Sequence, residues 1–91
     1  MSVEVRRTPL HYEAYLDGQR VGELAYARSG AVVTAFHTEV DPAAEGKGIG
    51  GILARRFLDD AREAGDRVVA LCPFVKGWIA RHPDYADLVV R

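Results

Sequence analysis

Cysteine and long apolar runs are scarce in this sequence, and their scarcity argues against two classes of protein. Cys72 is the single cysteine, so no disulfide can form within the chain. That usage is typical of a reducing compartment, and we expect a cytoplasmic location. No run approaches the roughly 18 apolar residues of a membrane span, and residues 1–7 lack the apolar core of a signal peptide. We therefore expect no membrane partner.

A surplus of charge of either sign is also missing. The chain carries 12 Lys and Arg against 13 Asp and Glu, a formal net charge of -1. The one dense basic pair, Arg55-Arg56, is followed closely by Asp59 and Asp60, a pattern typical of a solvated helix face. We therefore expect no nucleic-acid partner. The sequence predicts no metal site either.

The length sets the scale of what is present. With 91 residues, of which 48 % are hydrophobic and 27 % charged, the chain has the composition of a folded globule. It fits one small domain over residues 1–91. A chain of this size buries only roughly 60–65 % of its unfolded surface, so we expect a thin core.

The first half of the sequence predicts an antiparallel meander. Asp17-Gly18 is a strong hairpin signal, because a type I′ turn needs a positive φ at both central positions. Ser29-Gly30 indicates a second turn. The strands are expected at His11–Leu16, Arg20–Ala27 and Ala31–Val40, with a further strand at Val3–Arg7.

The second half predicts a helix and a parallel strand. Apolar residues at helical spacing indicate an amphipathic helix over Gly50–Ala64, closed by Gly65 in a left-handed cap. The apolar run Arg67–Leu71 is typical of a buried, parallel-paired strand. A short helix is expected at Phe74–Arg81, with one more turn at Pro83–Leu88. The fold class is therefore α/β, of the α+β mixed-sheet kind.

Glycine is concentrated over residues 46–51, between the strand at Ala31–Val40 and the long helix. Free amides at a helix N-terminus favour an anion, and glycines let a phosphate approach the backbone closely. The Walker pattern is absent, because Gly48 follows Lys47 where Ser or Thr is required. The dinucleotide pattern is matched by Gly46, Gly48 and Gly51, but the following strand ends without the acidic residue that would bind a ribose.

The run Glu45-Gly46-Lys47-Gly48-Ile49-Gly50 resembles the pyrophosphate loop of the GNAT N-acetyltransferase superfamily, Gln/Arg-x-x-Gly-x-Gly/Ala. Gly48 and Gly50 match this pattern, and Glu45 departs from it at the first position. The surrounding segments 37–40, 71–74 and 81–85 resemble a compact GNAT-like family of about 90–100 residues. The resemblance covers nearly the whole chain from about Tyr12.

The resemblance implies a cofactor, acetyl-CoA, and the residues that would hold it. The loop amides would bind the pyrophosphate, and the pantetheine arm would lie between the strands 31–40 and 67–71, which splay apart in the superfamily. The cofactor-binding residues expected on this ground are Val40, Gly46, Lys47, Gly48, Ile49, Gly50, Gly51 and Phe74.

His37, Glu39 and Cys72 are the candidate catalytic residues. In a regular strand His37 and Glu39 point to one face, the face that also carries Val33 and Ala35. With Cys72 they could converge near the thioester. Two mechanisms stay open: direct attack by an amine, with His37 or Glu39 taking a proton, or transfer through Cys72 activated by His37.

Two functions follow from the resemblance. The first is an acetyl-CoA-dependent N-acetyltransferase that acts on a primary amine of a protein or small molecule. The second is a non-catalytic module that keeps the fold and binds coenzyme A or a protein. The amine acceptor is unknown, and we expect a monomer or a weak homodimer.

Overall fold

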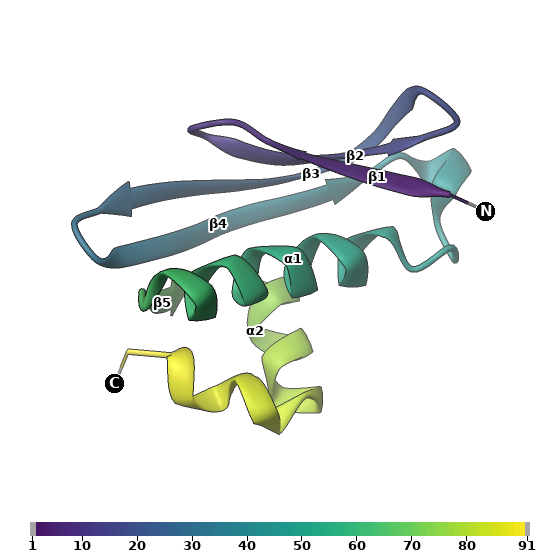
Figure 1. The fold of residues 1–91 in the computed structure, drawn as a ribbon. Coiled ribbons are helices and arrows are strands. Elements are labelled where there is room, and N and C mark those ends of the chain that lie inside the picture. The colour runs from purple at the N-terminus through teal and green to yellow at the C-terminus, as the bar shows by residue number, and fades with distance from the viewer. Residues whose placement is uncertain (1, 91) are drawn as a thin grey trace.

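The computed structural model describes residues 2–90, which form one five-stranded sheet with the helices on one side of it (Figure 1). The strands lie in sequence order and are antiparallel, except that the last two are parallel. They are β1 (Val3–Arg7), β2 (His11–Leu16), β3 (Gln19–Ser29), β4 (Val32–Val40) and β5 (Arg67–Ala70). The helices are α1 (Ile49–Ala64) and α2 (Pro73–Arg81), with 3₁₀ turns η1 (Pro42–Ala44) and η2 (Pro83–Leu88).

The predicted turns and caps are confirmed. Asp17 and Gly18 have φ of 52° and 81°, the positive values that a type I′ hairpin turn requires. Gly65 ends α1 in the left-handed conformation, and its amide contacts the carbonyls of Ala61 and Arg62. The helix begins at Ile49, one residue earlier than predicted, and the η1 turn before it was not predicted.

The core lies between the sheet and α1. All five apolar residues of the predicted helix face are buried: Leu53, Ala54, Phe57, Leu58 and Ala61. The ring of Phe57 meets the ring of Tyr12 edge-on, with centroids 5.8 Å apart, and the ring of Tyr26 at 5.9 Å. The inner face of the sheet is therefore defined by the side chains that point toward α1.

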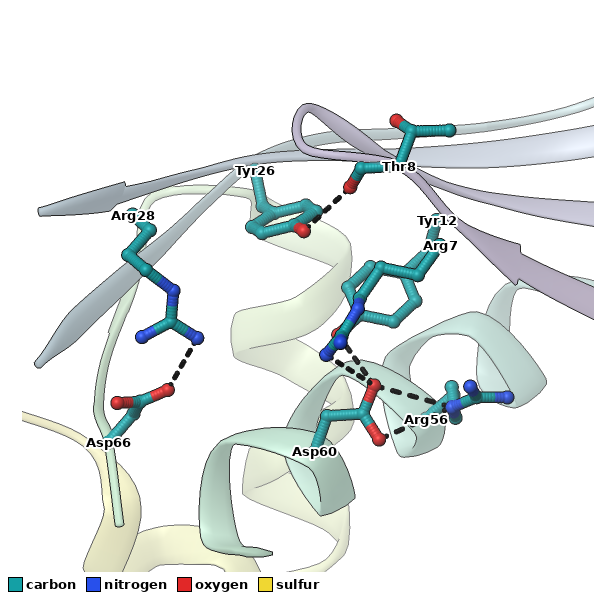
Figure 2. Close-up of polar contacts among 8 residues, drawn as sticks. All are labelled: Arg7, Thr8, Tyr12, Tyr26, Arg28, Arg56, Asp60 and Asp66. Carbon is teal, nitrogen blue, oxygen red and sulfur yellow. Dashed lines mark hydrogen bonds and ion pairs between the residues drawn. The ribbon is translucent and has the colours of Figure 1, made fainter. Parts of the chain in front are cut away.

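Asp60 of α1 joins the helix to the sheet through Tyr12 and Arg7, and it also contacts Arg56 of the same helix (Figure 2). The Tyr12 hydroxyl donates to Oδ2 of Asp60 at 2.7 Å, and the guanidinium groups of Arg7 and Arg56 lie 3.4 Å and 3.3 Å from the same carboxylate. Burial, and next the hydrogen bond to Asp60, raise the pKa of the Tyr12 phenol. The phenol therefore stays protonated and remains a donor.

Removing the Tyr12 hydroxyl tests this contact. We expect Tyr12→Phe to lower the free energy of unfolding by about 1–2 kcal/mol, because a hydrogen bond to a charged acceptor is lost while Asp60 keeps both arginines. Urea unfolding measures the change. Tyr15→Phe is the matched control, because that hydroxyl donates only to Glu13, two residues away in β2. Equal losses for the two variants would contradict the account.

A bulge in β4 overturns one prediction. Tyr26 of β3 pairs with Ala35, but the preceding Ala25 pairs with His37, so Phe36 is an extra residue in β4. One extra residue reverses the faces of the residues that follow it. His37 therefore points away from α1, onto the outer face of the sheet.

The prediction that His37 and Glu39 share a face with Val33 and Ala35 is therefore wrong. Val33 and Ala35 are buried on the inner face, whereas His37 and Glu39 are exposed on the outer one. Thr38 takes the inner position instead, because it pairs with the buried Leu24 of β3. Alternation alone placed the pair on the wrong side, although it correctly placed His37 and Glu39 together.

Candidate active site

A gap opens between β4 and β5. The two strands pair only from Val32 to Ala35, opposite 67–70. The Ala35 carbonyl then accepts from the amides of Leu71 and Cys72, at 3.0 Å and 2.9 Å, and the chain turns into α2. β4 continues to Val40, and none of the strands formed by residues 2–90 lies beside it on that side. The expected splay of these strands is thus present.

The open side of β4 carries free backbone groups. The Asp41 amide donates to the Val21 carbonyl of β3 at 2.8 Å. Because backbone groups alternate sides along a strand, the amides and carbonyls of Val40 and Thr38 point the other way, into the gap. Unpaired backbone groups need a partner. An extended chain bearing amides would supply one.

The glycine loop leads from β4 to α1 along an open path. Gly46 and Gly48 have φ of 83° and 75°, which favour glycine at both positions. Gly48 is the residue before α1, and its carbonyl accepts from the Ile52 amide at 3.1 Å. No side chain of residues 2–90 caps this end of the helix, and its first turn holds no acidic residue. The first amides of α1 are therefore available to an anion.

A cavity of about 230 Å³ lies over these amides. Seven of the eight expected cofactor-binding residues line it: Val40, Gly46, Gly48, Ile49, Gly50, Gly51 and Phe74. Lys47 is exposed and is not among the lining residues, whereas Ala44 and Glu45, which the sequence did not single out as binding residues, are. At Gly50 a Cβ would lie 2.7 Å from the far end of the Phe74 ring, so the ring would have to shift to admit a larger residue. The ring thus packs directly on the helix backbone.

His37 and Glu39 form a pair on the outer face. His37 Nε2 lies 2.8 Å from Glu39 Oε1, and the two side chains are 54 % and 70 % exposed. A carboxylate that accepts from Nε2–H leaves Nδ1 as the proton acceptor of the ring. The pair therefore has the arrangement of an oriented general base.

Cys72 lies apart from that pair. It is the residue before α2, is 2 % exposed, and has its Sγ 3.3 Å from the hydroxyl of Thr38. Because Thr38 and His37 point to opposite faces of β4, the structure does not bring His37 to the thiol. The expected convergence of Cys72 with His37 and Glu39 is not seen. Sequence reasoning missed Thr38, whose contact depends on the bulge.

A second cavity, of about 460 Å³, shares one lining residue with the first. Glu23, Glu39 and Asp41 line it together with Arg20. Val40 lines both cavities. A ligand over the loop amides and a ligand beside Glu39 would therefore both have Val40 within reach.

The helices and the polar side chains bear on membranes and metals. None of the helices formed by residues 2–90 has the length and apolar character that crossing a bilayer requires. Within the same residues, the structure brings together no three His, Cys, Asp or Glu side chains that could hold a metal ion.

Comparisons with known proteins were made for sequence families and for solved structures. A family model described as GCN5-related N-acetyl-transferase matches residues 11–88. A search of curated proteins found no match. The solution structure of a GCN5-like protein from Staphylococcus aureus has 21 % sequence identity and a TM-score of 0.75, over 96 % of this chain and 87 % of that one.

Two crystal structures extend the comparison. The ribosomal-protein-S18-alanine N-acetyltransferase of Escherichia coli has 18 % identity and a TM-score of 0.64, over 71 % of this chain and 43 % of that one. A GNAT family acetyltransferase from Brucella melitensis, in complex with acetyl-CoA, has 34 % identity and a TM-score of 0.59. That match covers 67 % of this chain and 44 % of the other, so the chain spans less than half of these two proteins.

Proposed function

Because the chain belongs to the GCN5-related N-acetyltransferase family, we propose that it binds acetyl-CoA at the glycine loop and transfers the acetyl group to a primary amine. The observation that carries the proposal is the uncapped start of α1 under a cavity lined by the loop. A diphosphate would be held there by the first amides of α1 and by the helix dipole, both of which favour an anion. Gly46, Gly48, Ile49, Gly50 and Gly51 would hold it.

The rest of the ligand would follow the gap between β4 and β5. Val40 and Thr38 offer backbone amides and carbonyls to the pantetheine arm, as a neighbouring strand would. Phe74 would cover the arm where it leaves the loop. Lys47 lies outside the cavity lining, and we propose that it adds a positive charge near the phosphates from solvent.

The chain's own residues would then handle the proton. Bound acetyl-CoA would supply an acetyl thioester, whose carbonyl carbon a neutral amine can attack. The C–N bond would form as the C–S bond breaks, and coenzyme A would leave as the thiol once the amine's proton reaches its sulfur. The amine would approach over the outer face, beside the cavity that Glu39 lines. His37 would accept the amine proton at Nδ1, while Glu39 holds the Nε2–H and stabilises the resulting imidazolium.

We propose that Cys72 lines the gap without carrying the acetyl group. Its thiol has the Thr38 hydroxyl as its contact and is nearly inaccessible to solvent. A nucleophilic cysteine needs a base or a cation that favours the thiolate. His37 is the base that the sequence offered for this role, and it points to the other face of the sheet.

Intact mass spectrometry separates the two routes. After incubation with acetyl-CoA, we expect no hydroxylamine-sensitive acetyl adduct on the wild-type protein. We expect Cys72→Ala to keep acetyl transfer within about threefold of the wild-type rate, because the change removes one buried sulfur and no proton acceptor. An adduct that disappears in Cys72→Ala, together with loss of transfer, would establish the covalent route instead.

A non-catalytic module is the second candidate function. Glu45, which stands where the superfamily pattern has Gln or Arg, favours it. Coenzyme A release from acetyl-CoA, measured with a panel of lysine peptides, N-terminal peptides and polyamines, decides between the two. We expect release above the rate without an acceptor for at least one amine. Binding of acetyl-CoA without release from any amine would support the module.

A further inference from the structure

β1 leaves one edge of the sheet open. It pairs with β2 on one side only, and no other described strand lies beside it. At the other edge of the sheet, by contrast, the last residues cover β5: Val89 bridges Val68, and the Val90 amide donates to the Val68 carbonyl at 2.8 Å. An exposed edge is a template for pairing with another strand.

The backbone of β1 determines which residues can pair outward. The Thr8 amide, just beyond β1, donates to the His11 carbonyl of β2 at 2.8 Å. Alternation therefore directs Arg6 and Glu4 toward β2, and directs the amides and carbonyls of Val3, Val5 and Arg7 to the free edge. A second strand along this edge would bond to these three positions.

The side chains of β1 select one register for a second copy. In an antiparallel pair centred on Val5, Val5 lies opposite the partner's Val5, where both backbones face outward and can bond. Glu4 then lies opposite the partner's Arg6, and Arg6 opposite the partner's Glu4. A pair centred on Glu4 or Arg6 would set like charges against each other and turn the backbone groups away.

We propose that two copies of the chain pair antiparallel along β1, about a two-fold axis at Val5. The arrangement joins the two sheets into one and is isologous, so it closes at a dimer. Glu4 and Arg6, which lie 2.7 Å apart within one chain, would form a group of four alternating charges with the partner's pair. The occupant of this edge is therefore a second copy of the chain.

The dimer is expected to be weak and sensitive to salt. Five residues of each chain meet, and charged side chains flank the axis in solvent, where ion pairs contribute little. β1 lies at the opposite edge of the sheet from the gap between β4 and β5. Pairing therefore leaves both proposed active sites open, and its failure would not affect the proposed function.

Sedimentation equilibrium at low salt over a wide range of protein concentration tests the proposal. We expect a reversible monomer–dimer equilibrium for the wild type, and at least tenfold weaker association for Glu4→Arg and for Arg6→Glu, because each sets like charges opposite each other. Asp84→Arg, an equal change of charge on the exposed η2 turn, is the control and keeps the wild-type association.

Mixing the two single variants gives the decisive result. In a pair of a Glu4→Arg chain with an Arg6→Glu chain, positions 4 and 6 of one face opposite charges on the other. We therefore expect the two variants to associate with each other more strongly than either does with itself. A wild type that stays monomeric at millimolar concentration overturns the proposal. So does a mixture that associates no better than its components, because general damage to β1 would not be repaired by mixing.

Discussion

Replacing His37 with alanine is expected to lower kcat/KM for acetyl transfer by about 100-fold or more, while the affinity for acetyl-CoA stays within about twofold. The proposed base takes the proton of the attacking amine and contacts no part of the coenzyme. Its loss therefore affects transfer and leaves the loop and the gap intact. Steady-state rates with saturating acetyl-CoA, together with direct titration of the coenzyme, measure the two effects.

His11→Ala is the matched control for this variant. His11 also lies beside a carboxylate, with its Nε2 3.8 Å from Glu23, but it sits on β2, two strands from the gap. We expect it to transfer acetyl groups at the wild-type rate. Glu39→Gln should fall between the two, because it keeps the imidazole and removes the charge that orients it. Equal rates for the His37 and His11 variants would exclude His37 as the base.

Placing a carboxylate at the start of α1 is expected to weaken coenzyme A binding by about 100-fold or more, equivalent to about 2.7 kcal/mol. Gly48→Asp puts a negative charge beside the amides that would hold the diphosphate. The new charge repels the ligand and competes for the same donors. Isothermal titration of the variant with coenzyme A measures the loss.

Gly48→Asn separates charge from backbone strain. Gly48 has a φ of 75°, and Asn and Asp are the residues that tolerate this region best after glycine. The two variants therefore carry similar strain and similar side-chain volume. We expect Asn to bind coenzyme A at least tenfold more tightly than Asp. Equal affinities would mean that the loop does not bind an anion.

The glycine loop was largely predictable from sequence because its glycines have local causes. A positive φ at Gly46 and Gly48 disfavours a Cβ, so the composition directly records the geometry there. The hairpin at Asp17-Gly18 was predictable for the same reason. Turns and loops whose backbone conformation depends on one residue type can be predicted from the local sequence, without knowledge of the rest of the fold.

The face that carries His37 and Glu39 was not predictable in the same way. The bulge at Phe36 comes from how β3 and β4 pair, and no glycine or proline in β4 marks its position. Strict alternation thus assigned His37 to the face of Ala35, and the Thr38 contact with Cys72 went unnoticed. A single unpaired residue reverses every side chain beyond it, so pairing outweighs local pattern there.

The open edge of β1 shows a further limit. Val3–Arg7 was predicted as a strand, but its place at the sheet edge depends on the order of all five strands. Only the strand order shows that β1, with its self-complementary charges, is an edge strand and not a strand inside the sheet. The spacing of Glu4 and Arg6 is visible in the sequence. It indicates a pairing between two copies only once β1 is known to be an edge strand.

Titration of ¹⁵N-labelled protein with coenzyme A, followed by amide NMR, tests the central claim most directly. The account predicts the largest shifts at the amides of residues 46–51, with a second group at Thr38 and Val40 on the open side of β4, and little change in β1 and β2. Absence of shifts at residues 46–51 with saturating coenzyme A, or shifts confined to another face, would contradict it.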